Sequence, residues 1–111
     1  MIYTEMFTKD IDRVIHFLSE VDSSSYFDQM NYLNQLNDLI RNKQYDAFFE
    51  KANGSELWGG SGSIWESEYG MSVQQRKIFE GLLISLLKLL KENNKMEKRA
   101  KSVFKILTSK N

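Results

Sequence analysis

Residues 72–93 constrain the fold most, because they form one long segment that is too apolar to lie on a surface. Large apolar side chains recur there at three- and four-residue steps and would cover more than half of a helix. Ser72 and Gln75 form the capping-box pattern that begins a helix. The segment therefore predicts a central helix of ~33 Å that packs against several others. Its apolar residues are Ile78, Phe79, Leu82, Leu83, Leu86, Leu87, Leu89 and Leu90.

Two further helices are predicted in the first part of the chain. Residues 3–21 place apolar side chains along one stripe and charged side chains on the other faces. A second helix follows, because Ser25 and Asp28 make a capping-box-like pair and apolar residues continue from there at helical spacing. This second helix should end near Asn42.

A short third helix is predicted over residues 45–52, and a last helix over residues 96–108. Asn53 and Gly54 follow the third helix, and both tolerate the left-handed backbone that closes helices. The chain contains no proline, which fits uninterrupted helices. We therefore expect an all-α fold over residues 1–111, a single-domain bundle of about five helices.

Residues 53–70 differ in composition from the rest of the chain and lie between the third and fourth expected helices. Five of the six glycines and both tryptophans lie in this stretch. We interpret it as the one long non-helical stretch, with weak extended character at residues 63–69. Its glycines would give the tryptophans room to pack, at least one of them in the core. The expected loop organisers are Trp58, Gly59, Gly60, Gly62 and Trp65.

Several classes of chemistry are excluded or disfavoured by the residue types. The chain has no cysteine, and its one histidine is His16, which we expect to be half-buried and hydrogen-bonded. Disulfides, thiolate sites and multi-histidine metal sites are therefore excluded. The glycine spacing fits neither pattern of nucleotide-binding loops. We expect no catalytic residue, no cofactor, no metal and no small-molecule substrate, so the chain is not expected to be an enzyme.

A membrane location is not expected either. The longest apolar run, residues 81–90, contains Lys88 and is much shorter than the ~20 residues of a membrane span. Glu5, Lys9 and Asp10 interrupt the N-terminal apolar residues, so this segment does not read as a secretory signal. The expected location is the cytoplasm.

The formal net charge of zero hides a division between the two parts of the chain. Residues 1–70 hold twelve acidic and five basic residues, a balance of −7, whereas residues 71–111 hold three and ten, a balance of +7. An acidic surface would attract a basic partner and speed its association. The alternative is that the two parts neutralise each other within one fold.

The last predicted helix is basic and offers a second functional hypothesis, a small nucleic-acid-binding regulator. Its bases are Lys98, Arg99, Lys101 and Lys105. The helix lacks the interleaved aromatic residues of a single-strand binder and a recognisable helix-turn-helix turn. A solvated lysine face is favoured over nucleic-acid binding.

The chain resembles a known group around its tryptophan–glycine loop. A short helix with Asp46 and Phe49 is followed by residues 57–66, Leu-Trp-Gly-Gly-Ser-Gly-Ser-Ile-Trp-Glu, and then by the leucine-rich helix. This arrangement, over residues 26–107, resembles small bacterial immunity proteins of contact-dependent growth inhibition and other polymorphic toxin systems. The resemblance implies a cytosolic, non-enzymatic protein. It would bind the C-terminal toxin domain of a large exported protein one-to-one, often a nuclease domain, and cover its active site.

Under this hypothesis the acidic residues on the loop, together with two aspartates near the first turn of the chain, are the candidate toxin contacts, and Tyr69 is a candidate aromatic anchor. Trp58 and Trp65 would organise the loop and share in the interface. Whether the glycine loop is scaffold or interface stays open at this level. The candidate contacts are Glu56, Glu66, Glu68, Tyr69, Asp22 and Asp28.

Overall fold

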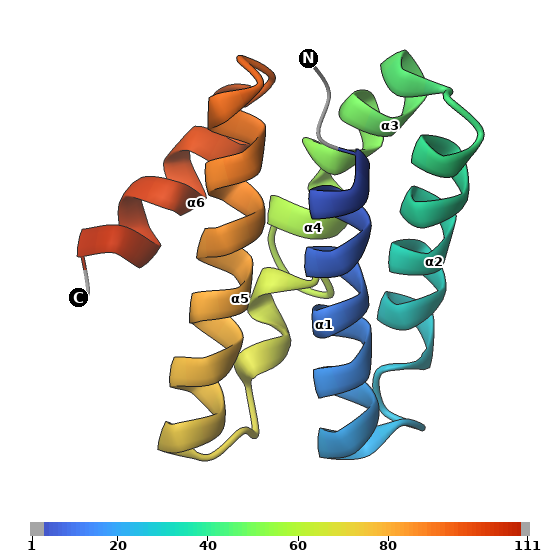
Figure 1. The fold of residues 1–111 in the computed structure, drawn as a ribbon. Helices are drawn as coiled ribbons and strands as arrows, with labels where there is room; N and C mark the ends of the chain where they lie inside the picture. Colours follow the sequence, from blue (N-terminus) through green and yellow to red (C-terminus); the bar gives the residue numbers. More distant parts are fainter. Residues whose placement is uncertain (1–3, 110–111) are drawn as a thin grey trace.

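The computed structural model describes residues 4–109, and within this range the chain is helical without strands. The all-α bundle expected from the sequence is confirmed (Figure 1). The expected loop between the third and fourth helices contains two further short helices, α4 and η1. The elements are α1 (Thr4–Asp22), α2 (Phe27–Arg41), α3 (Tyr45–Ala52), α4 (Ser55–Trp58), the 3-10 helix η1 (Trp65–Glu68), α5 (Val73–Glu92) and α6 (Lys98–Ser109).

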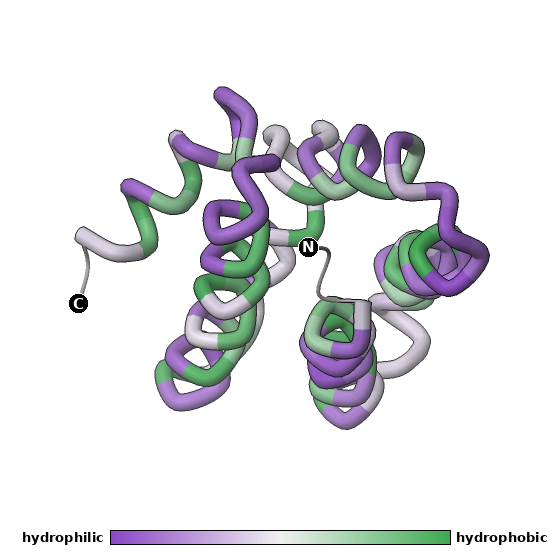
Figure 2. Tube along the Cα trace, turned by 45° about the horizontal axis from the view of Figure 1, so that its top comes forward, coloured by the Kyte–Doolittle hydropathy of each residue, from purple (hydrophilic) through white to green (hydrophobic). Residues whose placement is uncertain are grey.

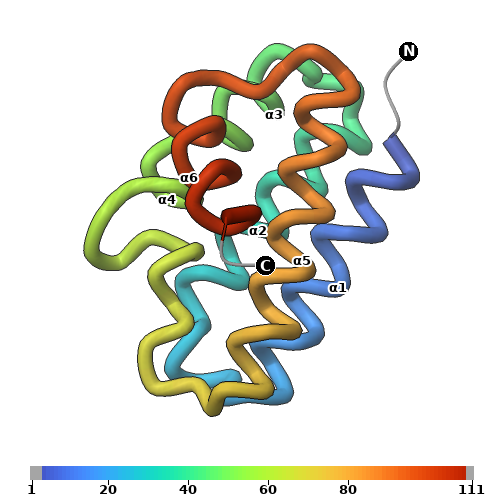
Figure 3. The backbone as a smooth tube through the Cα atoms, turned by 90° about the vertical axis from the view of Figure 1, so that its left-hand side faces the viewer, coloured from blue at the N-terminus to red at the C-terminus, as the bar shows by residue number. Residues whose placement is uncertain are grey.

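The three long helices lie side by side, with α1 between α2 and α5 and antiparallel to both (Figure 1). The chain from α3 through α4 to η1 passes behind them in that view, and η1 contacts α5. Seen from the side, α6 lies across α5 and next to α4 (Figure 3). The Gly- and Trp-containing segment therefore lies between α6 and the start of α2.

The leucine-rich helix α5 is central, as its apolar circumference predicted, because it contacts α1, α6 and η1. Phe79, Leu83 and Leu87 are at most 1% exposed. Hydrophobic and hydrophilic residues alternate along each helix (Figure 2), so each helix turns one apolar face inward. The first turns of α5 are less covered, since Val73 and Ile78 are more than half exposed. No helix within residues 4–109 is both long and apolar enough to cross a bilayer.

Of the two capping boxes predicted from the sequence, one is present in the structure and the other is not. Ser72 and Gln75 form the full capping box, with Gln75 N donating to Ser72 Oγ (3.1 Å) and Ser72 N to Gln75 Oε1 (2.9 Å). The predicted pair of Ser25 and Asp28 does not form, and α2 begins without a side-chain cap. Ser25 instead donates from Oγ (2.7 Å) and N (3.2 Å) to the carboxylate of Asp22, because this acceptor lies just across the turn.

The stop signal of Asn53 and Gly54 is confirmed, since α3 ends at Ala52, but neither residue is left-handed: their φ angles are −104° and −77°. Asn53 acts through its buried side chain. Its Nδ2 donates to a carbonyl of α3 (2.8 Å) and to the carbonyl of Lys95 (2.7 Å), and its Oδ1 accepts from Glu97 N (2.8 Å). The left-handed conformation occurs instead at Lys43 and Asn94, after α2 and α5. Asn53 thus ends α3 and fastens the segment that leads into α6.

Two smaller expectations also differ from the structure. Residues 63–69 are not extended, since most of them form the 3-10 helix η1. His16 is not half-buried: its side chain is 76% exposed, and its Nε2 contacts the carboxylate of Glu20 one turn later. Its place on the polar face of α1, one residue before the partly covered Phe17, explains the exposure.

Candidate partner-binding surface

The tryptophan–glycine segment is a tightly bonded unit. Trp58 is 2% exposed, and its Nε1 donates to the carbonyl of Ala52 (2.7 Å). Trp65 is partly exposed, and its Nε1 donates to the carbonyl of Gly59 (2.8 Å). Ser63 Oγ donates to the same carbonyl (2.9 Å). One tryptophan therefore belongs to the core, as expected, and the other closes the loop at its surface.

The loop glycines differ in what the backbone demands of them. A Cβ atom on Gly59 would lie 2.4 Å from the carbonyl oxygen of Ser55, so the close approach of these two backbones requires glycine. Gly62 has a φ angle of +87°, in the region that favours glycine. Gly60 has open space around it and no such backbone angle. The structure thus gives a steric reason for Gly59 and Gly62 as loop organisers and none for Gly60.

The six candidate contacts from the sequence come from four places in the chain. Asp22 ends α1, Asp28 lies in the first turn of α2, and Glu56 lies on α4. Glu66 and Glu68 belong to η1, and Tyr69 follows them directly. We call these six residues the acidic surface.

One long-range hydrogen bond joins the two ends of the acidic surface. Tyr26 Oη donates to the carbonyl of Ser67 at 3.0 Å, which ties the turn after α1 to η1. Ser67 lies between Glu66 and Glu68. Burial, together with the charge of nearby Asp22, raises the pKa of Tyr26. The carboxylates of α1 and η1 are therefore brought to the same part of the molecule.

The other two acids of the surface, Asp28 and Glu56, lie close together, because both line a small hollow of about 270 Å³. Tyr32 forms part of its wall and donates from Oη to the carbonyl of Lys51 (2.7 Å). Burial of Tyr32, followed by the negative charge of Glu56, raises the pKa of Tyr32 to about 12. The phenol therefore stays protonated at neutral pH and holds its hydrogen bond.

Four of the five carboxylates of this surface are exposed to solvent. Asp22, Asp28, Glu56 and Glu66 are exposed, and none of the four forms an ion pair with another residue in the range 4–109. Hydrogen bonds from Ser25 and Ser24 lower the pKa of Asp22, which keeps it charged. Tyr69 is 92% exposed.

Exposed aromatic side chains accompany these charges. Besides Tyr69, Phe27 is 61% exposed at the start of α2, next to Asp28. The helical periodicity of α2 gave no signal for this, since Phe27 continues the apolar spacing of the buried face. Charged residues around exposed aromatic side chains are a combination suited to protein recognition.

Sequence reasoning missed a groove on the other side of η1, between η1 and α6. Its volume is about 580 Å³. Apolar side chains line its walls, and the two bases Lys98 and Arg99 stand at the start of α6. We call it the α6 groove; its apolar and basic lining residues are Trp58, Trp65, Val103, Ile106, Lys98 and Arg99. No local pattern announces it, because its two walls come from separate helices.

The described residues contain no group of three or more histidines, aspartates and glutamates placed to hold a metal ion. Comparison of the chain with protein-family models, with curated proteins and with solved structures gives no match.

Proposed function

We propose that this chain is an immunity protein that binds a cognate toxin domain one-to-one in the cytoplasm and neutralises it by covering its active site. The observation that carries the proposal is the acidic surface, which combines the exposed carboxylates of Asp22, Asp28, Glu56 and Glu66 with the exposed ring of Tyr69. The resemblance of residues 57–66 to immunity proteins supports it independently of charge.

Electrostatics favours a basic partner for this surface. A nuclease active site is typically basic, because it must hold phosphates. Four exposed carboxylates that form no ion pair with another described residue would steer such a domain toward this surface and suppress wrong orientations. The carboxylates would occupy the place of the substrate phosphates without being cleaved.

The fold suits an inhibitor that works by shape and charge. The Trp58 and Trp65 hydrogen bonds and the required glycine at position 59 hold the loop in one conformation. The bond from Tyr26 to Ser67 holds η1 against the turn after α1. A preorganised surface loses little conformational entropy on binding, which favours a tight complex.

The test uses the gene next to the one that encodes this chain. The C-terminal domain of any large exported protein encoded there is expressed with and without this chain, and growth and co-purification are recorded. Rescue of growth together with a one-to-one complex supports the proposal. If the domain is toxic and this chain neither restores growth nor binds the domain, the proposal is contradicted.

A nucleic-acid-binding regulator remains the second candidate function. The observation in its favour is that all four bases of α6, Lys98, Arg99, Lys101 and Lys105, are exposed. Such binding would be detected as a gel shift that weakens steeply with salt. The absence of a shift at low salt would remove this candidate.

A further inference from the structure

The α6 groove combines apolar walls with two bases, and these would suit a short acidic segment that carries a large apolar side chain. Trp65 is partly exposed and Ile106 is 45% exposed, so the groove presents apolar area to solvent. Lys98 and Arg99 are exposed at the same place, and neither forms an ion pair with another described residue. Glu97 also lines the groove, so two bases stand against one acid and the groove is basic on balance. The volume of about 580 Å³ lies in the range that is typical of ligand-binding pockets.

The chain itself carries such a segment directly beside the groove. Trp65 lines the groove, and the next residue along η1, Glu66, is exposed. Tyr69 follows η1 and, at 92%, is the most exposed large aromatic side chain among the described residues. Glu66 and Tyr69 thus present a carboxylate and a ring on a short, structured piece of backbone.

We propose that two copies of this chain form a two-fold dimer in which Tyr69 of each copy enters the α6 groove of the other. In this arrangement Glu66 of one copy faces Lys98 and Arg99 of its partner. The dimer goes beyond the proposed inhibitor function, because no toxin takes part in it. It would compete with toxin binding, since both use Glu66 and Tyr69.

The positions of the segment with Glu66 and Tyr69 and of the α6 groove favour a closed dimer over an open-ended polymer. The donor segment and the groove share η1, so they lie next to each other on one molecule. Adjacent complementary patches can be exchanged across a single two-fold axis, which gives an interface used twice. The zero net charge of the chain adds no overall repulsion between copies.

Other occupants fit the groove less well. Nucleic acid would gain little from the aliphatic side chains of Val103 and Ile106, which offer bases neither a hydrogen bond nor an aromatic face to stack on. The exposed apolar area instead favours a side chain such as that of Tyr69, which is aromatic along its length and polar at its tip.

The first experiment is sedimentation velocity of the full chain from about 10 µM to 1 mM at low salt. Small interfaces of this kind are weak, so we expect a dimer with a dissociation constant on the order of 100 µM. Tyr69→Ala and Arg99→Glu should each raise this constant at least ~10-fold. Lys105→Glu is the matched control, because Lys105 is exposed on α6 but does not line the groove.

A charge exchange separates specific pairing from general attraction. In Glu66→Lys the new base on the segment meets Lys98 and Arg99 of the groove. In Arg99→Glu the carboxylate of Glu66 meets the new carboxylate at position 99, with Lys98 as the remaining base, so each variant alone should dimerise much more weakly than the wild type. An equal mixture of the two should form a heterodimer, because each segment then meets a groove of opposite charge. The dissociation constant of this heterodimer should approach that of the wild-type dimer.

The indole signals of the two tryptophans report the position of the contact in a nitrogen–proton NMR spectrum. The signal of Trp65 should move with protein concentration, and the signal of the buried Trp58 should move much less. A wild-type chain that stays monomeric over the whole concentration range would overturn the proposal. So would equal effects of Arg99→Glu and Lys105→Glu, or a monomer whose Trp65 signal moves only when a single-stranded oligonucleotide is added.

Discussion

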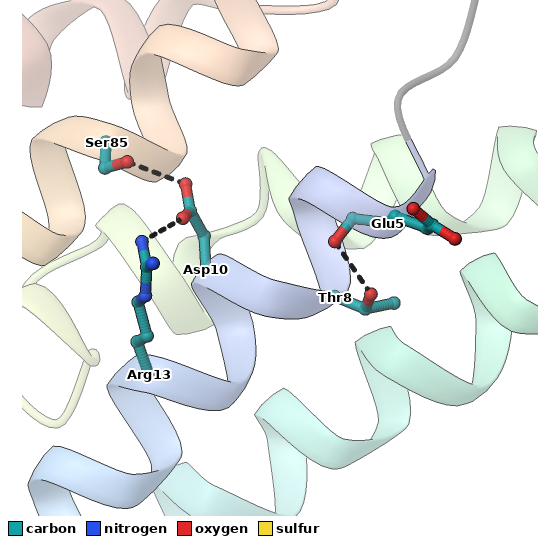
Figure 4. Close-up of polar contacts among 5 residues, drawn as sticks. All are labelled: Glu5, Thr8, Asp10, Arg13 and Ser85. Atoms are coloured by element: carbon teal, nitrogen blue, oxygen red, sulfur yellow. Dashed lines mark hydrogen bonds and ion pairs between the residues drawn. The ribbon is translucent and has the colours of Figure 1, made fainter.

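Ser85 on α5 donates a hydrogen bond of 2.7 Å from its Oγ to Oδ2 of Asp10 on α1, across the interface of two long helices (Figure 4). Asp10 is only 8% exposed, and its other carboxylate oxygen lies 3.4 Å from Nη1 of Arg13. The contact satisfies a largely buried carboxylate at the edge of the interface, where charged side chains such as Lys9 and Lys88 line a hollow between the two helices. It therefore fixes how α1 and α5 face each other, which apolar packing alone specifies less sharply.

Removal of this contact should destabilise the fold. In Ser85→Ala the Oδ2 atom of Asp10 loses its partner while the carboxylate stays largely buried, so the free energy of unfolding should fall by about 1–3 kcal/mol. Urea denaturation followed by circular dichroism measures the change. Ser19→Ala is the control, because its exposed hydroxyl bonds only to a carbonyl of its own helix and should change stability by less than about 0.5 kcal/mol.

The glycines of the loop should differ sharply in their tolerance of alanine. Gly59→Ala should lower the free energy of unfolding by about 2–3 kcal/mol, because the new Cβ would lie 2.4 Å from a backbone oxygen of Ser55. Gly60→Ala should stay within about 0.5 kcal/mol of the wild type, since nothing lies within 4 Å of the added atom. Thermal unfolding of both variants makes the comparison, and equal costs would show that the close approach does not constrain the loop.

Stability at high pH should depend on Tyr32. Its pKa is raised from 10.0 to about 12, so the folded state holds the phenol proton more tightly than the unfolded chain. This contribution to stability is complete below pH 10 and is lost as the pH rises toward 12. Tyr32→Phe should therefore lose less stability over this interval than the wild type does, although it is less stable at neutral pH without the bond to Lys51.

Tyrosinate absorbance and urea denaturation at a series of pH values check this prediction. Tyr69→Phe is the matched control, because Tyr69 is 92% exposed, and its pH profile should follow the wild type. A Tyr32→Phe profile that falls as steeply as that of the wild type would refute the assignment.

Charge reversal on the acidic surface should weaken the proposed toxin complex. Glu66→Lys with Glu68→Lys should raise the dissociation constant at least ~10-fold, mainly through slower association. The exposed residue Glu92 on α5 lies outside the acidic surface, so Glu92→Lys is the control. Surface plasmon resonance at several salt concentrations measures both rate constants.

Added salt should also weaken the proposed toxin complex. Added salt screens the exposed carboxylates, so the association rate should fall by more than the dissociation rate rises. An association rate that does not respond to salt would exclude electrostatic steering by the acidic surface. Full affinity in the double reversal variant would remove Glu66 and Glu68 from the contacts.

Much of the secondary structure was predictable because its causes are local. The apolar spacing along α1, α3 and α5 has the helical period, and these helices lie within one or two residues of the predicted limits. The capping box of Ser72 and Gln75 spans only three residues, so the residue types suffice to predict it. The local pair of Ser25 and Asp28 failed because Asp22, three residues before Ser25, accepts the backbone N–H that Asp28 would have accepted.

The acidic surface and the α6 groove depended on contacts between distant residues. The bond from Tyr26 to Ser67 spans 41 residues, and the bond from Glu97 to Asn53 spans 44. No spacing in the sequence marks such pairs, because they depend on how complete helices pack. The sequence by itself determined the five main helices, the charge division and the need for a compact glycine–tryptophan loop, but not the short helices α4 and η1 within that loop. Only the tertiary structure decided which carboxylates share a surface, since that follows from the packing of α1, α2 and η1.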